Sequence, residues 1–513
     1  MKNQPKPNHQ IFIGGNVLTI SDGRAEAVAV RDGKIEAVGR TAEIRARITP
    51  QTSVIELKGK TLMPAFIDAH MHLVSQGLKE TGYALDLSTA SSLKAALARV
   101  EEAVSLRERG AWVRGRGWDE MLWPERRYIS KSDLDKIAPY HPVALTRIDG
   151  HLLVANSEAL KQVSITKNSD EFDAANGLLR EKAVEEFARQ TKPPLDEIEA
   201  AILAGCKLAH SLGITALHDF VVPDYIRAYQ NLYRRGELSL RIQMHPFVEY
   251  LDSLKDLGFQ TGFGNGMLKL GAIKFFTDGS IGARNAALFD PYVDEKPATT
   301  GKLNYDQTEL NSLIQKTHES GFQLIIHAIG DQAIEAALNA IEYAGAKTDD
   351  RPRIEHLEMP TNEQLTRVKE LGVIASMQPN FVQWSGPGKL YETRLGKERD
   401  SLIDPHRAVL QKGITLTFGS DGMPFNPLYG VHAAVNAPHA GQRLSVEEAL
   451  KAYTWGAAYS GFDERALGTL EVGKRADLIV LSEDPSANPK HIDQIDVLET
   501  YLDAKLVYSQ GAK

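Results

Sequence analysis

Short apolar runs alternate with helical patterns through the middle of the chain. This alternation is typical of βα units, whose strands lie parallel in one sheet. Eight apolar runs of this kind are present, at residues 61–68, 213–218, 240–247, 270–277, 323–327, 353–356, 373–377 and 415–419. Eight parallel strands favour an α/β protein with a closed (β/α)8 barrel, the TIM-barrel class, over an open doubly wound sheet.

The interval between the first and second runs, from His72 to Leu212, is far too long for one helix. It contains helical patterns near residues 91–109 and 196–212. We therefore predict an inserted segment at about residues 80–210, after the first barrel strand.

Both ends of the chain are rich in short β-prone segments. At the amino-terminal end these are residues 11–20, 25–31 and 34–38, with Asp32-Gly33 as a hairpin signal between two of them. At the carboxyl-terminal end they are residues 476–481, 497–501 and 505–509. We predict that residues 1–62 and 464–513 form one small β-sandwich domain and that residues 63–463 form the barrel.

Composition and charge narrow the class of protein. The chain has 513 residues, of which 42% are hydrophobic and 25% charged, so a large core is feasible. The net charge of −8 argues against a nucleic-acid partner. The single cysteine, Cys206, fits a reducing compartment. The polar start MKNQPKPNHQ and the lack of a long apolar run predict neither a signal peptide nor a membrane segment, and hence a cytoplasmic protein.

The strongest local motif is His70-Met71-His72, at the end of the apolar run LMPAFID and one residue beyond it. On a strand, residues two apart point to the same side, so both imidazoles face one point. Neutral imidazole is a good ligand for Zn, Fe, Co or Ni. The motif alone is weak evidence, because two histidines at a barrel rim produce the same pattern.

Four further residues strengthen the motif by their positions. His327 ends FQLIIH, His356 ends RIEH, Asp421 follows TLTFGS, and Lys274 lies within LGAIKFF. Each sits at or near the carboxyl end of a predicted strand, where barrel active sites lie. The alternatives are a buried ion pair between Lys274 and Asp278 and hydrogen-bonded core histidines. The whole set in this order favours a metal centre.

With these residues, the chain resembles the amidohydrolase superfamily. The segment PAFIDAHMH resembles the strand-one motif of that superfamily, and GTLEVGKRADLIVL resembles the return into its small β-sandwich. WVRGRGWDE, RIDGHLLVANSEAL, AIKFFTDGSIGARNAAL and IIHAIGD together resemble the family-3, YtcJ-like branch. The similarity runs from about Gly14 to Leu481. One departure is Ala65, where the superfamily usually has glycine in a turn.

The resemblance implies a role for each residue. His70 and His72 would hold the more buried metal ion, and His327 and His356 the more exposed one. In many members the strand-four lysine, here Lys274, is carbamylated and bridges two metals. Asp421 would bind metal and act as the general base. One or two divalent ions, most often zinc, are expected.

The implied reaction is hydrolysis of a C–N bond in an amide, an N-formyl compound or a cyclic amide. Asp421 would take a proton from water and pass it to the leaving group. An ester, lactone or carbamate hydrolase on the same site, or a non-catalytic metal-binding regulatory protein, are the alternatives. The intact Asp421 argues against the last. The small-molecule substrate itself is not fixed by sequence, because specificity resides in the loops.

A second set of residues has a structural role as an equal alternative. His151, Trp118 and Trp384 are expected to reach the pocket, and His218 to support the site from the end of the second strand. Asp278, together with Arg284, is expected to order the loop after Lys274. The pair Cys206 and His210, four residues apart, is more simply a helix-face coincidence than a nucleophilic pair. We also expect a homodimer that binds neither nucleic acid nor membrane.

Overall fold

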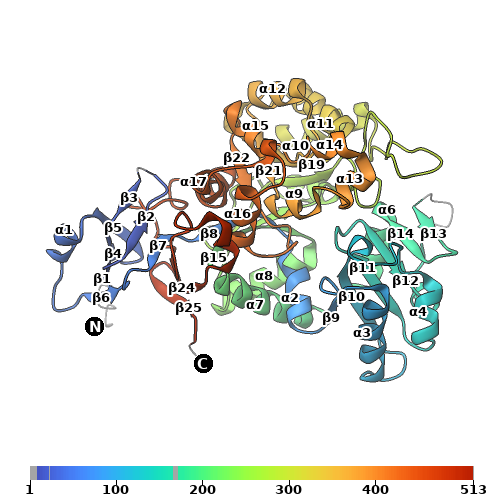
Figure 1. Cartoon of the computed structure of the whole chain (residues 1–513), viewed down its shortest axis with the longest axis horizontal. Helices are drawn as coiled ribbons and strands as arrows, with labels where there is room; N and C mark the ends of the chain where they lie inside the picture. Colours follow the sequence, from blue (N-terminus) through green and yellow to red (C-terminus); the bar gives the residue numbers. More distant parts are fainter. Residues whose placement is uncertain (1–8, 22, 166–170, 512–513) are drawn as a thin grey trace.

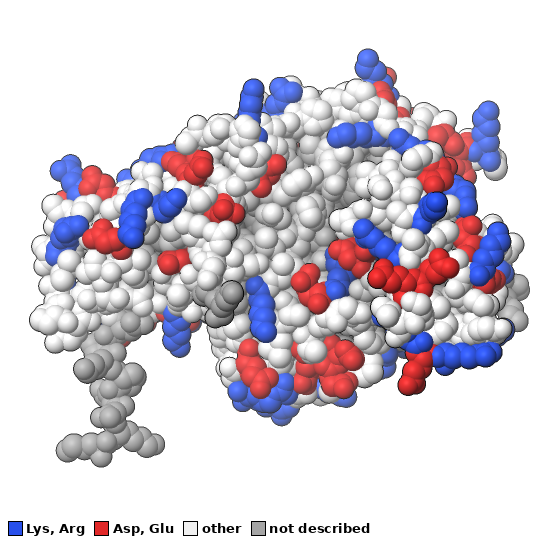
Figure 2. All heavy atoms as spheres, turned by 60° about the horizontal axis from the view of Figure 1, so that its bottom comes forward, with Lys and Arg blue, Asp and Glu red and all other residues white. Residues whose placement is uncertain are grey.

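The computed structural model describes residues 9–21, 23–165 and 171–511 (Figure 1). The sequence expectation of no signal peptide rests partly on residues 1–8, which lie outside this range. No helix in these described ranges is long and apolar enough to cross a membrane. On the face in Figure 2, basic and acidic side chains are intermixed around the described surface, with no continuous basic stripe.

The two ends of the chain pair in one antiparallel-rich sheet. β7, which leads into the first parallel strand, pairs with β2 on one side and with β23 from the carboxyl-terminal region on the other. The sheet order is β25-β24-β23-β7-β2-β3. Its strands are β2 (Asn16–Leu18), β3 (Arg24–Ala25), β7 (Thr61–Pro64), β23 (Leu478–Leu481), β24 (Val497–Leu502) and β25 (Lys505–Ser509).

A second small sheet, of order β5-β4-β1-β6, packs on the first. One apolar cluster joins the two, with Phe12 and Val28 from the small sheet and Val480 and Tyr501 from the first. The rings of Phe12 and Tyr501 meet edge to face at 5.2 Å. The elements are β1 (His9–Ile13), β4 (Ala27–Arg31), β5 (Lys34–Gly39), α1 (Thr41–Arg45) and β6 (Ser53–Glu56).

Two parallel sheets form the centre of the molecule, in the orders β17-β16-β15-β8 and β18-β19-β20-β21-β22. They meet at both edges. At one edge, Phe247 forms a parallel bridge with Lys274. At the other, the Asp421 N–H donates to the His70 carbonyl at 2.9 Å. The strands are β8 (Phe66–Met71), β15 (Ile214–Val221), β16 (Arg241–Pro246), β17 (Leu268–Leu270), β18 (Ile273–Phe276), β19 (Leu324–Ala328), β20 (Arg353–His356), β21 (Ile374–Met377) and β22 (Leu416–Phe418).

The prediction of one continuous strand over residues 270–277 is wrong at its start, because the strand is interrupted at Gly271. The Gly271 N–H donates to the Met244 carbonyl at 2.7 Å, and the Ala272 N–H donates to Nδ1 of His245 at 2.8 Å. A Cβ on Gly271 would lie 2.4 Å from the His245 ring, so only glycine allows this close approach. β17 therefore ends one sheet and β18 begins the other.

Helices cover the outer faces of the parallel strands. Apolar residues three or four apart on α11, such as Ala333, Ala337 and Ile341, are buried against the strands, and the helix ends at Gly345 in the left-handed conformation. In Figure 1, α10, α11, α12 and α15 lie around β19, β21 and β22, and α7 and α8 lie beside β15. The helices are α2 (Leu73–Glu80), α7 (Leu195–Ser211), α8 (Pro223–Arg235), α9 (Leu251–Asp256), α10 (Gln307–Glu319), α11 (Asp331–Ala344), α12 (Asn362–Glu370), α13 (Leu390–Leu395), α14 (Lys397–Asp400), α15 (His406–Gln411), α16 (Pro427–Val435), α17 (Val446–Lys451) and α18 (Ala457–Ser460).

Between β8 and β15 the chain builds a separate sheet of order β13-β14-β12-β11-β10-β9. Its own core contains Trp118 and Trp123, whose rings stack at 5.9 Å. Ser92 caps its longest helix by accepting a hydrogen bond from Ala95. The elements are β9 (Ala84–Asp86), α3 (Leu93–Ser105), β10 (Val113–Trp118), α4 (Lys131–Ile137), β11 (Val143–Arg147), β12 (Leu152–Ala155), α5 (Ser157–Leu160), β13 (Phe172–Asp173), β14 (Leu178–Arg180) and α6 (Glu181–Gln190).

The turn between β11 and β12 brings this segment to the carboxyl ends of the parallel strands. Ser280, in the loop after β18, donates its hydroxyl to the Asp149 carboxylate at 2.6 Å. The His151 ring lies 5.3 Å from the His327 ring, between centroids. The mouth of the parallel strands is therefore lined partly by residues from outside them.

Candidate active site

His70, His72 and Asp421 converge at the carboxyl ends of β8 and β22. Their ligand atoms all lie within 4.8 Å of one another. Nε2 of His70 is 3.8 Å and Nε2 of His72 is 3.5 Å from Oδ1 of Asp421. Three donors this close, from two neighbouring strand ends, form a group that could hold a metal ion.

Glu355 orients His70 from behind. Its carboxylate contacts Nδ1 of His70 at 2.5 Å, which leaves Nε2 of that ring facing Asp421. Arg353 and Ser376 in turn hold Glu355, through an Nε–Oε1 contact of 2.9 Å and an Oγ–Oε2 contact of 2.8 Å. A carboxylate behind a ligating histidine fixes the ring tautomer and direction. Glu355 was not predicted from the sequence, although its place beside His356 on the short strand RIEH was the available signal.

His327 and His356 lie next to His70. The His356 ring centroid is 4.6 Å from that of His327 and 4.8 Å from that of His70. Nε2 of His327 is held by the Gly279 carbonyl at 3.2 Å, and its Nδ1 has no hydrogen-bond partner in the described chain. Nδ1 of His356 is likewise buried and unpartnered among the described residues. These two nitrogens are free to bind a ligand.

The backbone is strained at two of these positions. His356, the last residue of β20, has φ +73°, and Asp421, three residues after β22, has φ +51°, so both non-glycine residues adopt the left-handed region. Such a conformation costs about 1–3 kcal/mol and persists only where the surroundings enforce it. Here it turns both side chains out of the strand direction and toward His70.

Lys274 is a buried amine that forms no ion pair with the described residues. Its side chain is 1% exposed, and its Nζ lies 4.2 Å and 4.8 Å from the ring centroids of Phe220 and Phe276. Nζ has no hydrogen-bond partner within the described ranges. Burial lowers the pKa of Lys274 to about 8. The neutral amine is therefore close in free energy to the charged one.

Asp278, the alternative partner of Lys274, is engaged elsewhere. Its carboxylate accepts backbone N–H groups of Ala287 at 2.9 Å, Ile329 at 3.1 Å and Gly330 at 2.9 Å. Burial raises the pKa of Asp278 to about 7. Asp278 thus ties the loops after β18 and β19 together. Arg284 pairs with Asp294 at 2.9 Å instead.

Burial sets the protonation states of the cluster. Burial, with the nearby positive charge of Lys274, holds the pKa of His70 well below its usual value. Burial lowers the pKa of His72 to about 3 and holds those of His327 and His356 well below the ordinary range. Burial raises the pKa of Asp421 to about 7. The site therefore offers neutral imidazoles and a carboxyl group that can exchange a proton near neutral pH.

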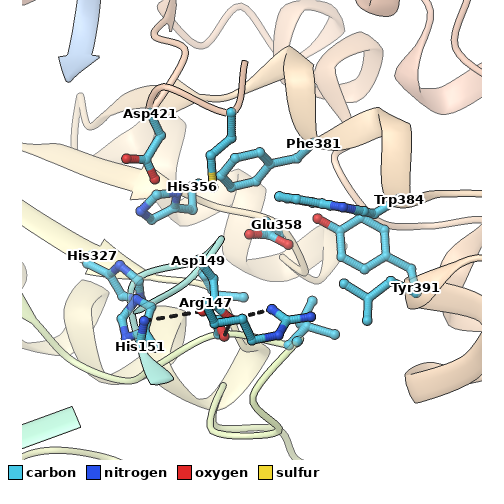
Figure 3. A pocket seen from close by; sticks show the side chains of 16 residues that line it. Arg147, Asp149, His151, His327, His356, Glu358, Phe381, Trp384, Tyr391 and Asp421 are labelled. Carbon is cyan, nitrogen blue, oxygen red and sulfur yellow. Dashed lines mark hydrogen bonds and ion pairs between the residues drawn. The ribbon is translucent and has the colours of Figure 1, made fainter. Parts of the chain in front are cut away.

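A pocket opens beside this cluster (Figure 3). His327, His356 and Asp421 form one wall, and Phe381, Trp384 and Tyr391 form the other. Phe381 and Trp384 come from the 3-10 helix Pro379–Trp384, and Tyr391 from α13. His151 and Trp384, both expected near the pocket, line it. Arg147, Asp149, Glu358, Phe381 and Tyr391 also line it and had not been singled out.

Arg147 is the centre of a buried ionic network at the pocket edge. It contacts Glu120 at 2.9 Å, Asp149 at 2.7 Å and Asp119 at 3.2 Å. Trp384 donates its indole N–H to Asp119 at 3.3 Å. The network joins the inserted segment to the aromatic wall.

Glu358 is the carboxyl group at the base of the pocket. It is buried, and the Tyr391 hydroxyl hydrogen-bonds to it. Burial raises the pKa of Glu358 to about 8, with the charge of Asp278 adding to the effect. His151, across the pocket, pairs with Glu181 at 2.8 Å. Although burial opposes it, that pairing raises the pKa of His151 to about 9.

The remaining predicted residues lie away from the pocket. His218 is buried beneath the cluster, where its Nδ1 contacts Arg353 at 2.9 Å. Trp118 lies in the core of the inserted segment and donates its indole N–H to the Leu145 carbonyl at 3.0 Å. Cys206 is buried, and His210 contacts Ser239 and the Ile214 carbonyl.

Comparisons with known proteins decide the family. The model of the Amidohydrolase family matches residues 53–508. The chain belongs to the amidohydrolase family. It is 32% identical to the putative amidohydrolase YtcJ of Bacillus subtilis (strain 168), over 98% of this chain and 99% of that one.

Two further known proteins are similar to this chain over nearly its whole length. The chain is 28% identical to an N-substituted formamide deformylase of Arthrobacter pascens, over 98% of each protein. It is 31% identical to an uncharacterized metal-dependent hydrolase of Pyrococcus furiosus of known crystal structure. The TM-score is 0.75, with 93% of this chain and 100% of the other covered. The family resemblance seen in the motifs is thus confirmed.

Proposed function

We propose that this protein is a metal-dependent hydrolase that cleaves a C–N bond in an amide, an N-formyl compound or a cyclic amide. The observation that carries the proposal is the convergence of His70, His72 and Asp421, with unpaired nitrogens of His327 and His356 beside them. Buried polar atoms without partners are rare in proteins, and their clustering indicates a missing ligand.

The donor set fits a divalent transition metal. Imidazole nitrogens and a carboxylate suit zinc, and the imidazoles are neutral and hence able to coordinate. His70, His72 and Asp421 would hold one ion, and His327 and His356 would contribute to the same ion or to a second. Bound there, the metal supplies Lewis acidity that activates a water molecule and polarises a carbonyl group.

Lys274 fits the role of a carbamylated bridging ligand. A protonated amine has no lone pair to donate, whereas a carbamate offers two oxygens. The lowered pKa of Lys274 favours the neutral amine that captures CO2. Its unpartnered Nζ, enclosed between Phe220 and Phe276, leaves the position open to that modification.

Asp421 moves the proton in the proposed mechanism. A carboxylate oxygen of Asp421 accepts a proton from the attacking water molecule and donates it to the leaving nitrogen, so that the C–N bond breaks without releasing an amide anion. Glu355 keeps His70 oriented throughout, and the aromatic wall excludes bulk water.

We also propose the domain plan predicted from the sequence. The two parallel sheets, joined at both edges, are the two halves of one (β/α)8 barrel over residues 63–463. The paired chain ends, residues 1–62 and 464–513, form the small β-sandwich domain. The insertion at about residues 80–210 supplies one rim of the pocket. The strand pairings and the apolar cluster around Phe12 and Tyr501 support this division.

Ester, lactone and carbamate hydrolysis remain the alternative for the same site. The choice of a C–N bond rests on the family and on the relative named as a formamide deformylase. A non-catalytic metal-binding protein is disfavoured, because such a protein needs no proton-accepting Asp421.

The test is metal analysis together with a substrate panel. Protein purified without chelators should contain at least about half an equivalent of a divalent metal, and it should hydrolyse members of a panel of N-substituted formamides, amides and cyclic ureides. Matched esters, lactones and carbamates serve as the competing arm. Metal-replete protein that hydrolyses nothing on the panel would overturn the proposal, and a preference for esters would replace it with the alternative.

A further inference from the structure

One wall of the pocket combines three aromatic rings with one carboxyl group, and the nearest of these rings, Phe381, stacks on His356 at 5.8 Å between centroids. The rings of Phe381 and Trp384 are 4.9 Å apart, and those of Trp384 and Tyr391 are 6.3 Å apart, between centroids. The Glu358 carboxyl lines the pocket beside these rings (Figure 3). We call these four residues the aromatic subsite.

The cations that line the pocket are already neutralised. Arg147 contacts three carboxylates, those of Asp119, Glu120 and Asp149. His151 pairs with Glu181. Glu358 has only the Tyr391 hydroxyl, and in the described part of the chain it has no ion-pair partner. The aromatic subsite thus carries a carboxyl group that no protein cation balances.

A second carboxyl group stands behind Glu358. The Asp404 N–H donates to the Glu358 carbonyl oxygen at 2.8 Å, which fixes the two residues side by side. Asp404 is 1% exposed, and its Oδ2 has no hydrogen-bond partner among the described residues. The neighbouring Asp400 is engaged by His439 at 3.0 Å and by the Ser385 hydroxyl at 2.9 Å. Asp404 is therefore a buried carboxyl group with one oxygen unpaired in the described part of the chain.

We propose that the aromatic subsite binds a positively charged nitrogen on the substrate, an ammonium, amidinium or pyridinium group. The inference rests on the proposed function, because it identifies the substrate class of that same pocket. Aromatic faces attract cations through their quadrupole, most strongly where water is excluded. A buried carboxylate without a counter-charge is unfavourable, and a bound cation supplies that charge. The charged group then lies against Glu358, Trp384 and Tyr391, across the pocket from Asp421.

The competing interpretation is a purely apolar subsite for an uncharged aromatic group. It explains the rings but leaves the position of Glu358 and Asp404 unexplained. The two interpretations differ in what a single charge does to affinity at constant shape, and that difference can be measured directly.

The probes are N-methylpyridinium and toluene, which have nearly the same shape and differ by one positive charge. Neither has a lone pair that can bind the metal. Isothermal titration on the metal-replete protein at fixed ionic strength should give affinity for N-methylpyridinium at least about tenfold higher than for toluene. Equal or weaker binding of the cation would overturn the proposal.

The variants separate charge from shape. Glu358→Gln keeps the side-chain size, and it should lower affinity for N-methylpyridinium about tenfold while toluene binding stays within about twofold. Asp404→Asn should lower affinity for the cation by a smaller factor. Glu398→Gln, an exposed change on α14, is the matched control and should alter neither.

Two outcomes decide the remaining cases. If Glu358→Gln loses metal and toluene binding together, the variant has misfolded and Asp404→Asn becomes the deciding variant; unchanged affinity for the cation there overturns the proposal. If the wild type hydrolyses panel substrates without a charge preference, the subsite fails and the proposed function stands. If it binds the cation selectively but hydrolyses nothing, the proposed function fails and the subsite stands.

Discussion

Two clusters of buried charged side chains lie at opposite ends of the parallel strands, and they are built differently. At the amino end of β16, Arg241 contacts Asp477 at 2.8 Å and Asp503 at 2.7 Å. Both partners come from the region of the terminal sheet, so the cluster joins that sheet to the parallel strands. At the carboxyl ends, Lys274 and His356 have nitrogens with no partner in the described structure.

The difference in hydrogen bonding indicates the role of each cluster. Leaving a buried donor or acceptor unpaired costs about 1–3 kcal/mol, so several together call for a partner such as a bound ligand or ordered water. The Arg241 cluster is complete as it stands and contributes to the packing of two regions. The histidine cluster is incomplete without a ligand. Mutations at the two ends should therefore change different measurements.

Removing a predicted metal ligand from the histidine cluster should have the largest effect on metal content and hydrolysis. His70→Ala leaves Asp421 and His72 with one imidazole fewer and exposes the Glu355 carboxylate to the cavity. We expect metal content and hydrolysis to fall together to background, as followed by elemental analysis and turnover of the best panel substrate. Retention of stoichiometric metal would contradict the assignment of His70.

The next largest effect should distinguish the general base, Asp421, from the residues that only bind metal. Asp421→Asn keeps the shape and one oxygen donor but removes the proton acceptor, so kcat should fall about 10²–10⁴-fold. The four histidines remain, so metal content should fall much less. A variant with full metal that keeps more than about a tenth of wild-type kcat would show that another group is the base.

A substitution in the Arg241 cluster should change the stability of the fold alone. Arg241 and Asp477 are each 5% exposed, and breaking a buried pair costs about 3–5 kcal/mol. Asp477→Asn should lower the free energy of unfolding by about 3 kcal/mol, the low end of that range, because Asp503 remains. Denaturant titration measures this, with kcat and metal content unchanged.

The matched control for that prediction is an exposed ion pair near the terminal sheet. Arg24 pairs with Asp484, and the Arg24 side chain is 47% exposed. Asp484→Asn should therefore change stability by less than about 1 kcal/mol. Equal losses in the two variants would mean that burial does not distinguish the clusters.

Cys206 should show the smallest effect. Burial raises the pKa of its thiol to about 12, so the reactive thiolate is scarce at pH 8. We expect iodoacetamide to modify the native protein no faster than it unfolds, and Cys206→Ala to leave kcat unchanged. Rapid modification of the native protein with loss of activity would instead restore the Cys206–His210 pair as a candidate.

Residues on strands were more predictable from the sequence than residues in loops. His70, His72, His327 and His356 could be placed because strand ends share one edge, and an apolar run marks where each strand ends. Glu358 and Asp404 could not be placed in this way. They follow strands or helices in polar stretches, LEMPTN and LIDPH, which are equally typical of surface turns.

Two expectations differ from the structure for one reason: the continuous strand at residues 270–277 and the place of Trp118 at the pocket. A local sequence pattern contains no information on tertiary contacts. The break at Gly271 depends on the His245 ring, and no local sequence feature indicates that ring's approach. The place of Trp118 in the core of the insertion depends on Trp123 and on the Leu145 carbonyl. An aromatic residue in a motif of functional polar residues has the same sequence context whether it lines a pocket or packs in a core.

The position of β7 between β2 and β23 has a consequence for biosynthesis. On the ribosome, the strand Thr61–Pro64 and its neighbour Asn16–Leu18 emerge long before the strand Leu478–Leu481, which hydrogen-bonds to the other side of β7. Until then one edge of β7 has unpaired N–H and C=O groups, and such an edge can pair with other chains. The nascent protein must therefore carry an open β edge through synthesis of its whole central region, until β23 is translated and closes it.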